Sequence, residues 1–265
     1  LDKQLVWDYG VELVFCAILG AIIWDLITWW FGIPPSSSHA IIGGLIGAGG
    51  AVASVNAIVW GGTLKTGAFI IISPLVGMIA AFVLVVFVMR LARHVARTVV
   101  NHWFRKLQLA SSAFFALTHG TNDAQKGMGI IALVMLVSAG ASQSDQFVVE
   151  TWMMVSCGLA ISLGTFFGGW RIVKTMASRI TKLEPYQGFS AETGGAMMLL
   201  TTAILGIPVS TTHTISGSIM GVGATKRLSA VRWGLGRKIM IAWILTIPAS
   251  ATISGLLLLG MLHLG

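Results

Sequence analysis

The stretch Gly32-Ile33-Pro34-Pro35-Ser36-Ser37-Ser38-His39 returns 174 residues later as Gly206-Ile207-Pro208-Val209-Ser210-Thr211-Thr212-His213. A glycine-spaced apolar stretch follows each copy and reads IIGGLIGAG after the first and ISGSIMGVG after the second. One such motif of proline, hydroxyls and histidine could be a helix cap. Two copies in register, each at the start of an apolar segment, indicate a duplicated site inside a membrane.

The composition is that of a membrane protein: 55% of the residues are hydrophobic, 10% are charged, and the mean hydropathy is +0.86. A soluble domain carries roughly a quarter charged residues. A soluble all-α core would also need polar faces at helical spacing, which this sequence lacks. We therefore predict an all-α, multi-pass helix bundle in the inner (plasma) membrane, with the lipid bilayer as a partner.

Hydropathy divides the chain into apolar spans, several of which run about 20 residues with almost no charge and are long enough to cross a bilayer. The predicted spans cover residues 11–31, 34–55, 68–90, 108–139, 147–170, 190–206, 208–225 and 239–263. The pair 190–206 and 208–225 crosses the membrane twice or forms a re-entrant hairpin.

Positive charge lies between the spans, because 14 of the 17 Lys and Arg residues fall in three clusters, Arg90 to Lys106, Arg171 to Lys182 and Lys226 to Lys238. Such clusters are typical of cytoplasmic loops. No cluster is interleaved with exposed aromatic residues, so we do not expect a nucleic-acid partner despite the net charge of +8.

Placing the three clusters on one side orients the two motifs oppositely, with the Ser36 motif opening inside and the Ser210 motif outside. Oppositely oriented repeats are typical of transporters whose substrate lies at the repeat interface. We therefore predict a first repeat over residues 1–90, an amphipathic cytoplasmic connection over 91–107 and a second repeat over 108–265.

The repeat extends beyond the motif, since Trp60, Lys65 and Pro74 match Trp233, Lys238 and Pro248 at nearly the same offset. The partner of segment 108–139 would fall before residue 1. The register therefore predicts that the first repeat in this chain lacks its leading third.

Segment 108–139 is apolar except for the polar run HGTNDAQKG at residues 119–127. A helix of this length would be about 48 Å long, too long for one straight crossing, so we predict an unwound break in the polar run. An acid within a membrane, here Asp123, is costly unless it meets a cation or a partner.

Three neighbours, Thr121, Asn122 and Gln125, add oxygen atoms to that of Asp123, and this set suits Na⁺. A lone carboxylate could instead carry a proton. The structural alternative is an ion pair between Asp123 and Lys126 on one helical turn.

The repeated motifs suit an anion, because a proline favours the first helical turn and the following residues present free N–H groups at the positive end of the helix dipole. Their hydroxyls add donors; the alternative is a capped helix start with spare hydroxyls. The hydroxyls belong to Ser36, Ser37, Ser38, Ser210, Thr211 and Thr212.

Three further titratable residues have open roles. We expect His39 and His213 to orient their neighbours by hydrogen bonds, with direct proton coupling as the alternative. Asp25 has no counterpart in the second repeat and is either a cavity residue or part of a helix–helix hydrogen bond.

The segments HGTNDAQKGMGII (119–131), PPSSSHAIIGG (34–44) and PVSTTHTISGSIMGVG (208–223) resemble the motifs of the inorganic phosphate transporter (PiT) family, bacterial type. The resemblance covers nearly the whole chain. It implies a secondary active transporter, not an enzyme, that imports inorganic phosphate by cotransport with Na⁺ or H⁺ and uses no other cofactor.

By this resemblance the hydroxyls of both motifs, together with Gln125, are phosphate ligands, and Asn122 and Asp123 are ligands of the cation, sodium if the coupling ion is Na⁺. From the residues themselves, Thr121 joins the cation set. The first-repeat motif of the family, Gly-Ala-Asn-Asp-x-Ala-Asn, does not occur here. This absence agrees with the missing leading third and implies that half of the cation ligands lie outside this chain.

Two other classes of function are weaker. An intramembrane hydrolase would need a nucleophile and a base within reach, whereas Ser38 and His39 are adjacent in sequence and no nucleophile elbow occurs. An anion channel could use the same hydroxyls, but an inverted repeat with a buried acid favours coupled transport. The sequence leaves open whether the protein forms a homo-oligomer.

Overall fold

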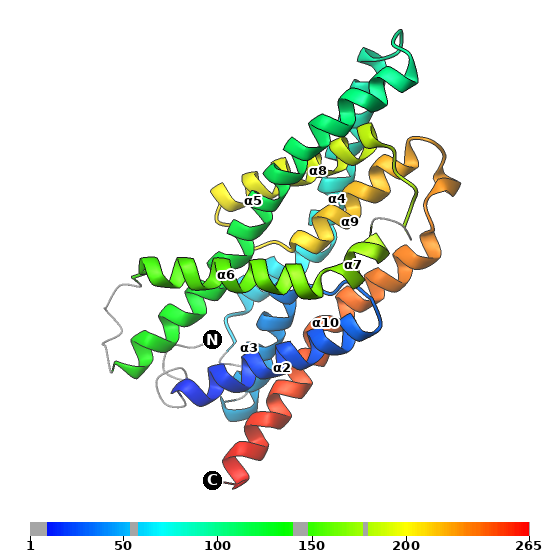
Figure 1. Ribbon diagram of the computed structural model, residues 1–265. Coiled ribbons are helices and arrows are strands. Elements are labelled where there is room, and N and C mark those ends of the chain that lie inside the picture. The colour runs from blue at the N-terminus through cyan, green and yellow to red at the C-terminus, as the bar shows by residue number, and fades with distance from the viewer. Residues whose placement is uncertain (1–9, 54–57, 140–147, 177–179, 265) are drawn as a thin grey trace. The chain divides into compact units, whose positions relative to one another are not determined.

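The computed structural model describes residues 10–53, 58–139, 148–176 and 180–264, and within these ranges the regular secondary structure is helical, without strands (Figure 1). This confirms the all-α prediction. The helices are α2 (Gly10–Trp30), α3 (Ser37–Ala53), α4 (Trp60–Leu91), α5 (Arg97–Ser138), α6 (Thr151–Gly168), α7 (Trp170–Lys174), α8 (Pro185–Ile204), α9 (Thr211–Ala224) and α10 (Trp233–Leu264).

Each predicted span contains a helix of the structure; residues 54, 55 and 147 of those spans lie outside the described ranges. Four of the described helices are long and apolar enough to cross a membrane: Gly10–Trp30, Trp60–Leu91, Thr151–Gly168 and Trp233–His263. Helices α3 and α9 have 17 and 14 residues. They are about 25 and 21 Å long, shorter than a hydrocarbon core of about 30 Å. Whether the pair 190–206 and 208–225 crosses twice or is re-entrant stays a prediction.

The predicted break in the polar run is wrong, because α5 continues without interruption from Arg97 to Ser138. Polar side chains of the run bond to the helix itself: the Thr121 hydroxyl donates to the Leu117 carbonyl at 2.8 Å, and Asn122 Nδ2 donates to the Thr118 carbonyl at 2.9 Å. Such bonds to the preceding turn satisfy polar groups without unwinding the helix. The helix also takes in most of the predicted connection 91–107.

Packing divides the chain into two units that are discontinuous in sequence. The first unit comprises Leu1–Gly67, Asp123–Gly168 and Ile241–Gly265, and the second comprises Ala68–Asn122 and Gly169–Met240. Helices α4, α5 and α10 pass from one unit to the other, so each unit combines parts of both predicted repeats. The repeat boundaries at residues 90 and 107 stay a prediction.

In the first unit, α2 and α3 form a hairpin that packs on the second half of α10. Leu13, Val14 and Leu258 belong to its buried apolar core. The backbones approach closely, because a Cβ added to Gly43 or to Gly47 would lie under 3.0 Å from the carbonyl of Ile247 or of Ala251, respectively. Small residues such as glycine allow this close approach.

In the second unit, the α8–α9 hairpin packs on α4 in the same way. A Cβ added to Gly217 or Gly221 would lie under 3.0 Å from the carbonyl of Pro74 or of Met78, respectively. The short helix of each predicted repeat therefore packs on the long, proline-containing helix of the other repeat. Each unit therefore contains helices from both predicted repeats.

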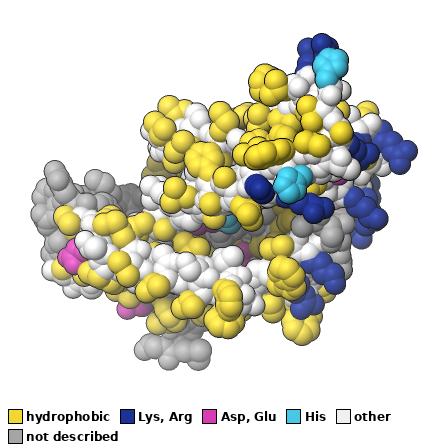
Figure 2. Space-filling view, turned by 45° about the horizontal axis from the view of Figure 1, so that its top comes forward, with side chains coloured by type: hydrophobic (Ala, Val, Ile, Leu, Met, Phe, Trp, Pro, Cys, Tyr) yellow, Lys and Arg dark blue, Asp and Glu magenta, His cyan; other side chains and the backbone are white. Residues whose placement is uncertain are grey.

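Apolar side chains cover much of the molecular face shown in Figure 2. Helix α4 carries exposed apolar side chains, including Ile71, Ile79, Val83 and Phe87, which are 58–66% exposed. Such exposure would be unfavourable in water and is expected of a helix that faces lipid. Lys and Arg side chains gather along one part of the same face.

Candidate functional site

The two motifs fold into the same hairpin connection. Gly32 and Gly206 adopt positive φ angles of 65° and 63°, which suit glycine. The N–H of each glycine bonds the carbonyl three residues before it, and the next N–H bonds the carbonyl five residues before it. Near the ends of the preceding helices, Thr28 and Thr202, each 4% exposed, make the same pair of hydroxyl bonds to earlier carbonyls. This matched threonine pair was not predicted from the sequence.

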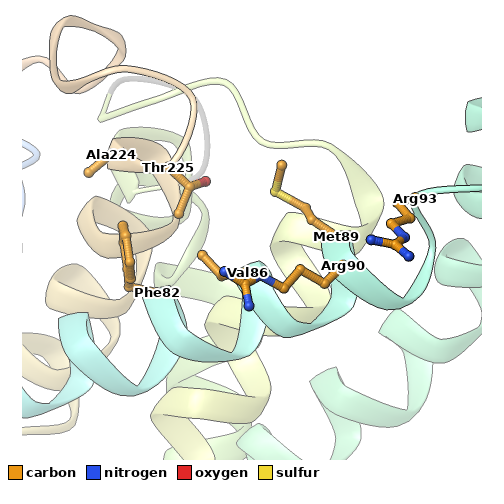
Figure 3. Close-up of a pocket in the computed structure, with 7 residues that line it drawn as sticks. All are labelled: Phe82, Val86, Met89, Arg90, Arg93, Ala224 and Thr225. Carbon is orange, nitrogen blue, oxygen red and sulfur yellow. The ribbon is translucent and has the colours of Figure 1, made fainter.

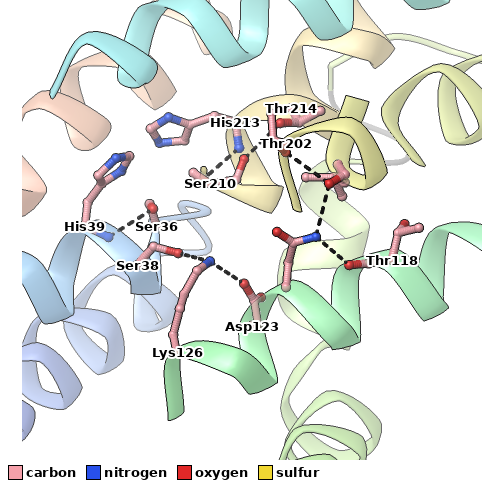
Figure 4. A network of polar contacts seen from close by, with 12 residues as sticks. Ser36, Ser38, His39, Thr118, Asp123, Lys126, Thr202, Ser210, His213 and Thr214 are labelled. Carbon is pink, nitrogen blue, oxygen red and sulfur yellow. Dashed lines mark hydrogen bonds and ion pairs between the residues drawn. The ribbon is translucent and has the colours of Figure 1, made fainter. Parts of the chain in front are cut away.

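A buried serine begins the short helix of each hairpin. Ser36 Oγ accepts a hydrogen bond from the His39 N–H at 3.3 Å, and Ser210 Oγ accepts one from the His213 N–H at the same distance (Figure 4). These bonds are N-caps. Capping engages a lone pair on each serine, and its O–H remains a donor for another group.

The other predicted hydroxyl ligands differ in exposure. Ser37 is exposed, whereas Ser38 is 6% exposed. In the second motif Thr211 is 4% exposed and Thr212 is half-buried. Buried hydroxyls at a helix N-terminus suit binding of an oxyanion, because the helix dipole and the first N–H groups act together with them.

Lys126 joins two of the predicted site residues in the first unit. Its Nζ donates to Ser38 Oγ at 2.5 Å and to Asp123 Oδ1 at 2.9 Å (Figure 4). The Asp123 and Lys126 side chains are 19% and 20% exposed, so the ion pair is largely removed from solvent. The structural alternative for Asp123 is therefore observed, and it extends to a hydroxyl of the first motif. Sequence reasoning missed this link because Ser38 and Lys126 are 88 residues apart.

The predicted cation ligands point in different directions from the continuous helix α5. Thr121 and the predicted phosphate ligand Gln125 lie on an exposed face. Asn122 is buried in the second unit and donates to the carbonyls of Thr118 and Leu199. The role of Thr121, Asn122 and Asp123 as cation ligands stays a prediction.

Both motif histidines are buried, with His39 and His213 at 1% and 0% exposure. Their backbone N–H groups complete the two serine caps. The predicted orienting role of their imidazoles, and the alternative of proton coupling, stay predictions.

Two further acids lie in helices next to apolar segments. Asp25 on α2 has a buried Oδ1 atom without a hydrogen-bond partner among the described residues, so the helix–helix hydrogen bond considered for it does not involve this atom. Glu192 on α8, which sequence reasoning missed, accepts hydrogen bonds from Ser111 at 2.5 Å and Gln108 at 3.5 Å within the second unit. The sequence signal for Glu192 was the presence of an acid within the predicted span 190–206.

The chain is similar to known proteins. The sequence model of the phosphate transporter family matches residues 3–254. A protein of Rhizobium meliloti (strain 1021) named "Probable low-affinity inorganic phosphate transporter" is 55% identical over 245 residues, which cover 92% of this chain and 73% of that protein. A protein of the same name from Bacillus subtilis (strain 168) is 39% identical over 260 residues, covering 97% and 78% of the two chains.

The fold also matches a solved structure. A protein named "The sodium-dependent phosphate transporter" superposes with a TM-score of 0.84 at 24% identity, covering 96% of this chain and 81% of that one. The family match and the candidate membrane spans confirm a multi-pass protein of the plasma membrane. The related proteins are transporters, which confirms the prediction that the chain is not an enzyme.

Proposed function

Because the chain belongs to the phosphate transporter family, we propose that the full-length protein imports inorganic phosphate by cotransport with a cation, Na⁺ or H⁺. The proposal carries over the substrate named for the relatives and the cation dependence named for the solved structure. The residues of this chain give it a chemical basis.

The observation that carries the proposal is the position of Lys126 between Ser38 and Asp123. Its ammonium is a largely buried positive charge next to a hydroxyl at the N-terminus of α3. An ammonium, a hydroxyl and the free N–H groups of a first helical turn are all donors, and phosphate oxygens are strong acceptors. We assign these groups to the first half of the phosphate site.

The second motif supports an equivalent half-site. It repeats the left-handed glycine, the buried serine cap and the following hydroxyls of the first motif. A neutral cradle of hydroxyls and N–H groups at Ser210, Thr211 and Thr212 binds an oxyanion without a formal positive charge. The opposite orientation of the repeats and their meeting at one phosphate stay predictions.

Coupling to a cation follows from charge. Phosphate carries one to two negative charges near neutral pH, and moving it through a low-dielectric interior is costly without compensation. Lys126 supplies part of this compensation, while Asp123 returns a negative charge that a coupling cation can offset. Both Na⁺ and H⁺ fit this requirement.

Uptake of radiolabelled phosphate by full-length protein in proteoliposomes tests the proposal. We expect Asp123→Asn to lower initial uptake at least tenfold while purification yield is kept. Glu12→Gln, which neutralises an exposed acid at the start of α2, is the matched control and should transport like the parent. Parent protein that takes up no more phosphate than protein-free liposomes under Na⁺ and pH gradients would refute the proposed function.

A further inference from the structure

The end of α4 borders a pocket in the second unit that contains none of the predicted phosphate or cation ligands. It has a volume of about 390 Å³ (Figure 3). Phe82, Val86, Met89 and Arg90 line it from α4, Arg93 from the turn that follows, and Ala224 from the end of α9. One part of the lining is therefore apolar and the other carries two guanidinium groups.

The two arginines form no ion pair with a described carboxylate. Glu184 accepts hydrogen bonds from Arg97 and pairs with Lys226, whose Nζ lies 3.1 Å from its Oε1. The sequence of the second unit contains only one other acid, Glu192, which is hydrogen-bonded to Ser111 and Gln108. The charge of Arg90 and Arg93 is thus uncompensated by the acids of this unit.

The guanidinium of Arg93 is partly fixed, because its Nε donates to His94 Nε2 at 2.8 Å. Its terminal N–H groups remain for a ligand, and a planar guanidinium matches the oxygens of a phosphate group. Arg90, at the end of α4, lines the same pocket. Two such groups at one pocket favour a phosphate-bearing anion.

The apolar lining continues onto the exposed surface of α4. Phe82, Val83, Phe87 and Met89 are 43–61% exposed, and α4 is long and apolar enough to cross a membrane. A hydrocarbon chain can follow this surface while a charged group stays at the arginines. A soluble anion would gain nothing from the apolar residues.

We propose that this pocket binds the phosphate headgroup of an anionic phospholipid, with an acyl chain lying along α4. Basic pockets between membrane helices on the cytoplasmic side bind such headgroups, and the cluster Arg90 to Lys106 is predicted to be cytoplasmic. The volume accommodates a headgroup rather than a whole lipid. This site is separate from the residues assigned to phosphate import.

Native mass spectrometry of detergent-solubilised full-length protein, titrated with phosphatidylglycerol or phosphatidylcholine, tests the proposal. We expect the parent to retain phosphatidylglycerol preferentially and Arg90→Gln/Arg93→Gln to weaken this retention about tenfold or more. The matched control, Arg105→Gln/Arg237→Gln, removes the same charge from exposed arginines outside the pocket and should bind like the parent. Ala224→Leu reduces the pocket without changing its charge and should also weaken retention.

Equal loss in the pocket and control double variants would mean attraction to surface charge alone and would overturn the proposal. Unchanged retention in the pocket double variant, with a folded protein, would do the same. Millimolar inorganic phosphate is added in a further arm. If inorganic phosphate displaces the lipid completely, the pocket is a site for a soluble anion instead. Because the readout is bound lipid, the result does not depend on whether the protein imports phosphate.

Discussion

Lys126 Nζ lies 2.9 Å from Asp123 Oδ1 within one turn of α5, and the same ammonium reaches Ser38 across the first unit. The pair places the one lysine of the predicted polar run between a predicted cation ligand and a predicted phosphate ligand. Two predictions follow from this arrangement.

Lys126→Met should lower phosphate uptake at least tenfold, because the substrate loses a buried positive partner and Asp123 keeps a buried charge without its ammonium. Breaking such a pair by removing one partner costs about 3–5 kcal/mol when fully buried, and less here because both side chains are about one-fifth exposed. The measurement is uptake normalised to folded protein.

Lys65→Met is the control for this variant, since Lys65 is an exposed lysine near the start of α4 in the same unit. It should transport like the parent. Equal activity in Lys126→Met and Lys65→Met would show that Lys126 does not contact the substrate.

Replacing external Na⁺ with choline at fixed pH should leave most of the uptake intact. The reason is that Lys126 already pairs with the Asp123 carboxylate, and the side chains of Thr121 and Asn122 donate hydrogen bonds to carbonyls of the preceding turn of α5. Uptake should then respond to an imposed pH gradient. Loss of uptake without Na⁺ would mean that the pair opens during transport to admit the ion.

Most of the fold could be predicted from hydropathy, because each predicted span needs only a long apolar stretch to become a helix. The hairpins could be placed from the repeated glycine and proline. The packing of helices from one predicted repeat on helices of the other could not be predicted. Glycines at helical spacing, such as Gly43 and Gly217, indicate close packing but do not identify Ile247 or Pro74 as the partner.

The site was predictable only in part. Sequence reasoning found Ser38 and Asp123 but treated the polar run as a break, because it did not consider that Thr121 and Asn122 can bond to the preceding turn. The contact of Ser38 with Lys126 depends on tertiary packing across 88 residues, for which a single sequence carries no local signal.

Glu184 should make the stability of the protein depend on pH below neutrality. Its hydrogen bond with Arg97, and then its pairing with Lys226, lower the pKa of this carboxyl from its ordinary value of 4.5. A carboxyl whose folded pKa is lowered stabilises the fold above its unfolded pKa. That contribution is lost as pH falls through the folded pKa.

Glu184→Gln should therefore lower the apparent melting temperature of the solubilised protein at pH 7, and the difference from the parent should shrink as the pH falls below about 4.5. Glu12→Gln, an exposed acid outside the described ion pairs, should show no such convergence. A difference that stays constant with pH would mean that Glu184 acts mainly as the N-cap of α8 and not through its charge.

The glycines of α3 offer a test of the close packing within the first unit. A Cβ added to Gly47 would meet backbone atoms of Ala251 under 3.0 Å, whereas a Cβ added to Gly50 meets nothing within 4 Å. Because backbone cannot move aside as a side chain can, Gly47→Ala should cost about 1–3 kcal/mol of stability.

Gly50→Ala, in the same helix, should instead be neutral or stabilising by up to about 1 kcal/mol, since alanine favours helix more than glycine does. Gly221→Ala on α9, which faces the Met78 carbonyl in the second unit, should behave like Gly47→Ala. The apparent melting temperatures of the three variants test this close packing. If Gly47→Ala and Gly50→Ala have the same melting temperature, α3 and α10 do not pack backbone to backbone at Gly47.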